Sequence, residues 1–185
     1  KFIAAIFVII ALSCASKKRP IPAKIEFKTN FEAAKALAIE TNRPMIIDFF
    51  TDWCKWCKTL DTLTYKDSLV IGLSLDNVFV KINAEVDTAL ARKYAVSGYP
   101  TIVLTKSNGE EIDRIWGYMP PADFYNQIQL YMQGKETMAD YQNRLQDEPE
   151  NLEYLSIIAE KYAGKSQYAK AIEINNKIIQ LDPDN

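Results

Sequence analysis

Residues 45 to 60 read Met-Ile-Ile-Asp-Phe-Phe-Thr-Asp-Trp-Cys-Lys-Trp-Cys-Lys-Thr-Leu, and this stretch decides the fold. Its apolar first half predicts a strand that is buried on both faces. Its second half predicts a turn and then a helix that begins at Cys54. Because Cys54 and Cys57 are three positions apart at a helix start, their thiols lie on one face and can close a disulfide. The pair can therefore exchange electrons with a second disulfide.

The helix start distinguishes the two sulfurs. Unsatisfied N–H groups and the positive end of the helix dipole favour a thiolate at Cys54, and the ammonium of Lys55 adds to this effect. Cys57 lies one turn deeper, so we expect it to resolve the mixed disulfide that Cys54 forms with a substrate. Half of a zinc site is the alternative interpretation. A tetrahedral zinc site needs four ligands, and the sequence has no histidine and no second cysteine pair, so we expect no metal and no cofactor besides the disulfide itself.

Composition excludes several classes of function. The 185 residues carry a formal net charge of −2 and no histidine, with an apolar fraction that suits a soluble globular core. Without a clustered basic face we expect no nucleic-acid binding. Without histidine, acid and base catalysis falls to carboxylates, lysines or thiols.

The first fifteen residues resemble a secretory signal. The apolar run from Phe2 to Leu12 follows Lys1 and has the length of a signal's hydrophobic region. Ala11-Leu12-Ser13-Cys14 resembles a bacterial lipoprotein processing box, which predicts lipidation of Cys14, although the order of Ala and Leu departs from the usual pattern. Ordinary cleavage after Ala15 is the alternative. Both interpretations predict an exported protein, with residues 16–24 as a tether, and in an exported chain a lone dithiol pair favours redox chemistry.

Two buried strands each carry one charge. The run from Met45 to Phe50 contains Asp48, and the similar run from Val78 to Asn83 contains Lys81. A helical crossover between these strands predicts a right-handed parallel unit. A buried carboxylate is costly unless it is paired, so we expect Asp48 to lie beside Lys81 and its pKa to be raised. Proton transfer to and from Cys57 is one role for the pair, and a purely structural ion pair is the other.

Helical and alternating patterns complete the expected element order. The elements are an edge strand at 25–27, a helix at 30–41, a short helix at 67–75, a helix at 88–94, strands at 101–105 and 112–116 joined by a two-residue turn at Asn108-Gly109, and a helix from Pro120 to Gly134 with Phe124, Ile128 and Met132 on one side.

In this order, with Gly98-Tyr99-Pro100-Thr101 before the hairpin, residues 25–134 resemble the thioredoxin fold, an α/β fold with a central mixed sheet flanked by helices. The Asp-Trp-Cys-x-x-Cys-Lys context and the extra helical stretch after it are similar to the C-terminal domain of the exported thiol reductase DsbD. The resemblance implies that Cys54 is the nucleophile, that Cys57 resolves, and that Asp48 and Lys81 form the family's buried acid–lysine pair.

The resemblance also implies a substrate groove. Pro100, preceded by Tyr99, matches the family's cis-proline, and Gly117 matches a glycine that borders the groove. We expect Lys55, Trp53 and Trp56 to contact substrate, and packing of the loop is the alternative role of Trp53. The Lys-Trp dipeptide between the cysteines departs from the Gly-Pro of thioredoxin, which leaves the direction of electron flow open.

Residues 135–185 form a separate helical segment in the sequence pattern. From Leu152 onward the spacing of apolar residues, and the stretch from Tyr168 to Asp182-Pro183, resemble one tetratricopeptide repeat of two antiparallel helices. A plain helical hairpin is the alternative. A single repeat cannot bury both of its faces, so we expect either a piece of a longer array or a repeat that docks on the thioredoxin-like domain.

The sequence thus predicts an exported thiol:disulfide oxidoreductase of the bacterial periplasm, acting as a reductase of disulfide-containing client proteins. Its expected partners are those clients and a membrane electron donor of the DsbD type, with lipid anchoring at Cys14. One alternative is a repeat-bearing adaptor whose thioredoxin-like domain holds clients and whose dithiol is incidental. The other is an electron relay dedicated to one partner such as an apocytochrome.

Overall fold

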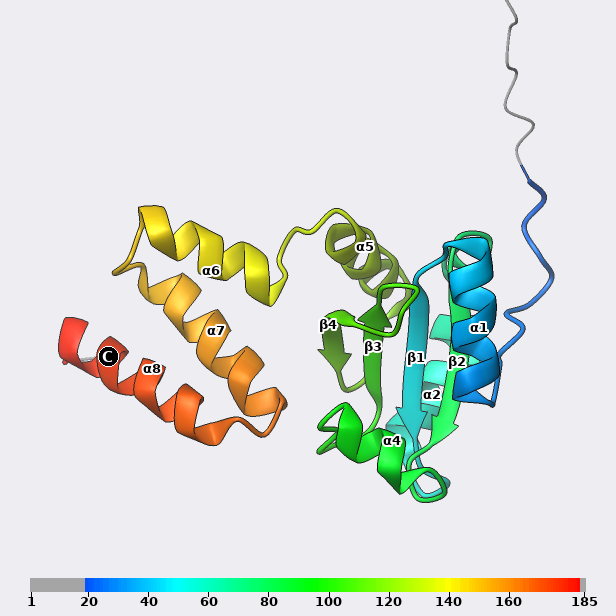
Figure 1. The fold of residues 1–185 in the computed structure, drawn as a ribbon, viewed down its shortest axis with the longest axis horizontal. Coiled ribbons are helices and arrows are strands. Elements are labelled where there is room, and N and C mark those ends of the chain that lie inside the picture. The colour runs from blue at the N-terminus through cyan, green and yellow to red at the C-terminus, as the bar shows by residue number, and fades with distance from the viewer. Residues whose placement is uncertain (1–18, 184–185) are drawn as a thin grey trace, which may run out of the picture.

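The computed structural model describes residues 19–183, so the predicted signal segment and its Cys14 lie outside the described residues. The fold is built on a four-stranded sheet with the order β2-β1-β3-β4 (Figure 1). β1 (Met45–Phe50) is parallel to β2 (Val78–Asn83) and antiparallel to β3 (Thr101–Thr105), which pairs with the antiparallel edge strand β4 (Glu111–Trp116).

Helices cover both faces of the sheet. Helices α1 (Phe31–Thr41) and α4 (Thr88–Lys93) pack on one face. The other face is covered by α2 (Lys55–Thr62), the 3-10 turn η1 (Thr64–Lys66), α3 (Ser68–Leu73) and α5 (Pro121–Met132). This mixed sheet between two helical layers is the thioredoxin fold that the resemblance implies.

Strand alternation places the charged pair inside the molecule. In β1 and β2 the side chains of Ile46 and Phe79 pack toward the layer of α2 and α5, while Ile47 and Val80 pack toward α1 and α4. Asp48 and Lys81 are aligned in the parallel register and lie on the same face as Ile46 and Phe79. Both charges therefore lie beneath the redox helix.

The predicted edge strand at residues 25–27 does not form. Instead, the backbone pairs with β2 only at Lys28, whose N–H donates to Phe79 O over 2.9 Å and whose carbonyl accepts from Lys81 N at 2.8 Å. Ile25 and Phe27 still pack against the core on the α2 side. The apolar side chains explain the strand-like pattern, but a single bridge cannot extend into a ladder.

The connection between β3 and β4 is longer than the predicted two-residue turn. Its turn closes through Gly109 N donating to Lys106 O at 3.0 Å, so Ser107 and Asn108 are its central residues rather than Asn108 and Gly109. Gly109 has φ +85°, a left-handed conformation that follows the turn and suits glycine. The two-residue turn was therefore wrong, although the antiparallel return of the chain is confirmed.

Three further helices follow the sheet domain. They are α6 (Met138–Asp147), α7 (Leu152–Gly164) and α8 (Tyr168–Leu181), and α7 and α8 form an antiparallel pair with α6 against α7 (Figure 1). This helical segment is present as the sequence indicates, and its interpretation as a tetratricopeptide repeat stays a prediction. Within residues 19–183, no helix has the length and apolar character needed to cross a bilayer.

The helical segment docks on edge strand β4. Lys161 of α7 donates to the buried carboxylate of Asp113 at 3.0 Å, and the N–H of Met138 at the start of α6 donates to the same carboxylate at 2.6 Å. The indole N–H of Trp116 donates to Gly164 O at 3.0 Å, where a Cβ at position 164 would come within 2.3 Å of the indole ring. The hydrogen bonds and close packing join α6 and α7 to the sheet.

Candidate functional site

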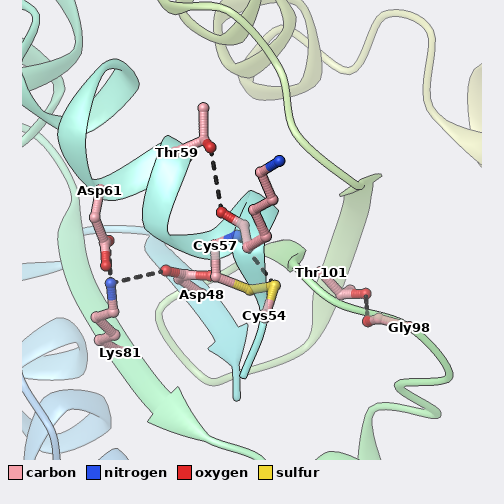
Figure 2. Close-up of a disulfide and its surroundings, with 9 residues drawn as sticks. Asp48, Cys54, Cys57, Thr59, Asp61, Lys81, Gly98 and Thr101 are labelled. Carbon is pink, nitrogen blue, oxygen red and sulfur yellow. Dashed lines mark hydrogen bonds and ion pairs between the residues drawn. A yellow bond between two sulfur atoms is a disulfide. The ribbon is translucent and has the colours of Figure 1, made fainter. Parts of the chain in front are cut away.

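The two cysteines of the redox motif form a disulfide at the start of α2 (Figure 2). The turn at residues 51–54 follows β1, and Cys54 is the N-cap residue of α2. The Sγ of Cys54 accepts a hydrogen bond from the N–H of Cys57 at 3.0 Å. Cys54 is 4% exposed and Cys57 is 1% exposed. Once the bond is reduced, the same N–H and the helix dipole stabilise negative charge on the Cys54 sulfur.

Asp48 lies on the face of the sheet that α2 covers, and Figure 2 draws it together with the disulfide. Its side chain is fully buried, neither carboxylate oxygen has a hydrogen-bond partner among the described residues, and Oδ2 is 3.5 Å from Lys81 Nζ. Burial raises the pKa of Asp48 to about 7, against the opposing effect of the Lys81 charge. Asp48 therefore populates both protonation states near neutral pH, as a general acid or base requires.

Lys81 is shared between two carboxylates. Its ammonium also pairs with Asp61 of α2 (Figure 2), a residue that the sequence interpretation missed. A signal was available, because Asp61 follows Cys57 by four positions and so lies on the same face of the redox helix. The charge of Asp61 contributes to the raised pKa of Asp48.

The Lys81 side chain is partly exposed to solvent. The Lys81 side chain is 17% exposed and lies 5.1 Å from the centre of the Phe50 ring. Together with Phe27, Phe50 and Val86, it lines an open cavity of about 270 Å³. Lys81 thus joins the buried Asp48 to a cavity that is open to solvent.

A proline loop approaches the disulfide from β3. The Tyr99–Pro100 peptide bond is cis, as the resemblance implies. Thr101 Oγ1 donates to Gly98 O at 2.8 Å (Figure 2), and the N–H of Gly117 donates to Pro100 O at 2.8 Å. Gly117 has φ +76°, a left-handed conformation at the end of β4 that suits glycine. These bonds fix the Pro100 loop and the Gly117 backbone to each other.

Exposed aromatic rings surround the redox motif. Trp53 is 68% exposed, donates its indole N–H to Glu85 Oε1 at 3.0 Å and meets the Tyr99 ring edge-on at 5.9 Å. Trp56 is 56% exposed and stacks on Tyr118 at 5.6 Å. Trp53 therefore lies at the surface and does not fill the interior of the loop. Tyr118 was not among the predicted contacts, although its place directly after Gly117 was a usable signal.

The predicted site residues thus lie around one end of the sheet. Cys54, Cys57, Asp48 and Lys81 form the interior of the site, and the predicted substrate contacts other than Lys55 form its rim. Lys55 is an exposed residue at the first position of α2, where its ammonium lies close to the motif in sequence. Among residues 19–183, no three His, Cys, Asp or Glu side chains come together in a group that could hold a metal ion.

Comparisons with known proteins agree with this geometry. A family model described as a thioredoxin-like domain matches residues 31–131. The thiol:disulfide interchange protein DsbD of Salmonella typhi is 33% identical over 112 residues, which are 56% of this chain and 20% of that protein. DsbD of Pectobacterium atrosepticum is 33% identical over 95 residues, 48% of this chain and 16% of that protein. The matched region spans about a fifth of the length of these curated relatives.

Solved structures show the same fold. A thioredoxin from Thermus thermophilus aligns with a TM-score of 0.52 at 27% identity, covering 57% of this chain and 85% of that one. The oxidoreductase DsbH aligns with a TM-score of 0.53 at 17% identity, covering 64% of this chain and 92% of that one, a likeness of fold alone. The family model matches more than half of this chain, and the Cys54–Cys57 disulfide is in place. The chain therefore belongs to the thioredoxin-like family of thiol:disulfide oxidoreductases.

Proposed function

We propose that this protein is an exported reductase of disulfides in client proteins. The observation that carries the proposal is the Cys54–Cys57 disulfide at the start of α2, on the face of the sheet that holds the buried Asp48. In the reducing direction, the Cys54 thiolate attacks a client disulfide and releases one client thiol. Cys57 then attacks Cys54, which closes the internal disulfide and releases the second client thiol.

In this proposal Asp48 accepts the Cys57 proton in the second step. A carboxyl group whose pKa is about 7 is matched to that task at neutral pH. The exposed rings of Trp53, Trp56, Tyr99 and Tyr118 offer flat apolar contacts for an extended client segment. The hydrogen bond from Gly117 N to Pro100 O fixes the loop that carries Tyr99 to the backbone that precedes Tyr118.

Export and recharging are further parts of the proposal. The pattern of residues 1–15 supports export to the bacterial periplasm, with lipid anchoring at Cys14, and the similarity to DsbD supports the same compartment. An oxidised protein needs two electrons for each cycle, so a membrane electron donor of the DsbD type is the proposed partner. A relay dedicated to a single partner such as an apocytochrome uses the same chemistry and differs only in the client.

The test compares two cysteine variants in the reduction of a protein disulfide such as that of insulin. Cys54→Ser removes the attacking sulfur and should abolish reduction, whereas Cys57→Ser should accumulate a covalent complex with the client because the mixed disulfide cannot resolve. Full activity in Cys54→Ser would contradict the mechanism.

A measured reduction potential decides the direction of electron flow. A value near roughly −270 mV supports a reductase that needs an upstream donor, whereas one near roughly −120 mV indicates a disulfide donor.

An adaptor role is the second candidate, and the docking of α7 on β4 favours it. Trp116, which contacts Gly164 of α7, directly precedes Gly117 at the Pro100 loop. The C-terminal end of α7 therefore contacts β4 next to the proposed client surface. If a Cys54→Ser, Cys57→Ser double variant still supported the protein's cellular role, the adaptor function would be favoured over the reductase.

A further inference from the structure

Tyr65 is a buried polar residue that the proposed mechanism does not yet use. It lies in η1, directly after the redox helix, and its ring packs edge-on against Phe27 at 5.1 Å and Phe124 at 5.8 Å. Phenylalanine would satisfy this apolar environment. The hydroxyl is buried among these rings and is the feature that needs an explanation.

The Tyr65 hydroxyl and the Asp48 carboxylate are both without a partner. Among the described residues, few buried side-chain oxygens or nitrogens make no hydrogen bond, and Tyr65 Oη and both oxygens of Asp48 are three of them. The two groups flank the same ammonium, because Lys81 Nζ is 3.5 Å from Asp48 Oδ2 and 5.7 Å from the centre of the Tyr65 ring. A donor and an acceptor that are both buried and both unpaired are each other's natural partners.

The two groups already influence each other. Burial and then the charge of Asp48 raise the pKa of Tyr65 well above its ordinary value, so the hydroxyl stays protonated and remains a hydrogen-bond donor. In return, the Tyr65 hydroxyl acts to lower the pKa of Asp48, against the larger effect of burial. The hydroxyl therefore favours the carboxylate form of Asp48 over the carboxylic acid.

We infer that Tyr65 is a positioning residue for proton transfer, whose hydroxyl donates to the Asp48 carboxylate and maintains it as a base for Cys57. This inference rests on the proposed function, because it assigns the resolving step to Asp48. Tyr65 itself gives up no proton. Its hydroxyl orients and stabilises the carboxylate that accepts the Cys57 proton.

The step balances in atoms and charge. The Cys57 thiol gives its proton to the Asp48 carboxylate, and the Cys57 sulfur forms a bond to Cys54 Sγ. The bond between Cys54 and the client sulfur breaks, and the client leaves as a thiolate that takes a proton from water. Asp48 is then a neutral acid, and it returns its proton toward solvent on the Lys81 side.

Three groups act on Asp48 in the oxidised protein and must be separated in any test. They are Lys81 from β2, Asp61 from α2 and Tyr65 from η1, and the thiol of Cys57 joins them after reduction. Tyr65→Phe changes one of these contributions and keeps the ring. Phe124→Leu is the matched control, because it alters the packing of the same ring from α5 and leaves the hydroxyl in place.

The primary measurement is a carbon-13 NMR titration of the Asp48 carboxyl in the oxidised full chain. Loss of a hydrogen bond to a charged group should move the titration midpoint of Tyr65→Phe upward by roughly 1 pH unit. Phe124→Leu should keep the wild-type midpoint even if it lowers the melting temperature. A midpoint in Tyr65→Phe equal to wild type, or an equal shift in Phe124→Leu, overturns the inference.

A kinetic measurement covers the reaction itself. The pH profile of disulfide reduction by the pre-reduced protein should move in the same direction in Tyr65→Phe. Below the midpoint the rate should then be roughly tenfold lower, because one pH unit changes the fraction of carboxylate tenfold. The NMR titration does not depend on any client. If Cys54→Ser retained activity, the proposed function would fail while the Tyr65 titration could still succeed or fail on its own.

Discussion

Two buried carboxylates, Asp48 and Asp113, each face a lysine from another part of the chain, and they are built in opposite ways. Asp113 accepts hydrogen bonds from Arg114 N at 2.8 Å, from Met138 N at 2.6 Å and from Lys161 Nζ at 3.0 Å. In the disulfide-bonded protein Asp48 makes no hydrogen bond with the described residues, and its lysine lies 3.5 Å away and is shared with Asp61. Both carboxylates are fully buried.

The difference teaches what each pair is for. Three hydrogen bonds compensate the burial of the Asp113 carboxylate, so the pair of Asp113 and Lys161 fixes α7 on β4. The Asp48 carboxylate is incompletely paired, so burial raises its pKa and its two protonation states are close in energy near neutral pH. The first arrangement serves attachment of the helical segment. The second serves proton transfer beside the disulfide.

The largest expected effect is at the attachment pair. Lys161→Met keeps most of the aliphatic stem but leaves the Asp113 charge buried without its cation, so the free energy of unfolding should fall by about 3–5 kcal/mol. Urea denaturation at pH 7 measures this change. Lys106→Met is the matched control, because Lys106 and Glu110 form an exposed pair and the change should stay within about 0.5 kcal/mol. Equal effects in the two variants would show that the Asp113 pair does not hold the segment.

The next substitution, Asp48→Asn, should raise the free energy of unfolding. The folded protein holds the pKa of Asp48 at about 7, above its ordinary value of 3.8, so the fold binds this proton more tightly than the unfolded chain does. Wild-type stability therefore falls as pH rises from about 4 to 7. Asp48→Asn removes the titration and should be more stable than wild type by up to about 4 kcal/mol above pH 8, with no gain below pH 4.

The same variant should be a poorer enzyme. Without a base for Cys57, the resolving step at pH 7 should slow by roughly 100-fold, the lower end of what general base catalysis contributes. Stability is measured by denaturation at pH 4 and pH 8, and turnover by insulin reduction. A variant that is less stable than wild type at pH 8 would assign Asp48 a structural role.

The contrast also explains what the sequence could and could not predict. Asp48 stands out because it interrupts an apolar strand, and the parallel register then brings Lys81 to it. Asp113 and Lys161 interrupt no continuous apolar run, since Asp113 stands between Ile112 and Arg114 and Lys161 stands between Glu160 and Tyr162. Their pairing depends on the docking of α7 on β4, a contact that joins positions 48 residues apart. Patterns within one element thus predict the redox site better than the domain attachment.

The residues around the redox site also divide into those that the sequence predicted and those that only the packing of elements revealed. The disulfide, the cis bond before Pro100 and the pairing of Asp48 with Lys81 were anticipated from the motif and the resemblance. Asp61 was missed because a polar residue on the outer turns of a helix is usually a solvated one. Its function as a second partner of Lys81 depends on how far the lysine reaches across the helix, which spacing alone does not determine.

The smallest expected change in stability comes from repeating the lysine substitution at the redox pair. Lys81→Met removes the cation that lowers the pKa of Asp48, so that pKa should rise above 7 and the carboxyl should be neutral at pH 6. A neutral Asp48 no longer needs a cation, and Asp61 is exposed enough to be solvated. The free energy of unfolding at pH 6 should therefore change by less than about 1 kcal/mol, far less than for Lys161→Met. Carbon-13 titration of Asp48 and urea denaturation at pH 6 measure the two quantities. If Lys81→Met were as destabilising as Lys161→Met and left the Asp48 midpoint in place, the two pairs would be the same kind of structural contact, and the proton-transfer role of Asp48 would lose its physical basis.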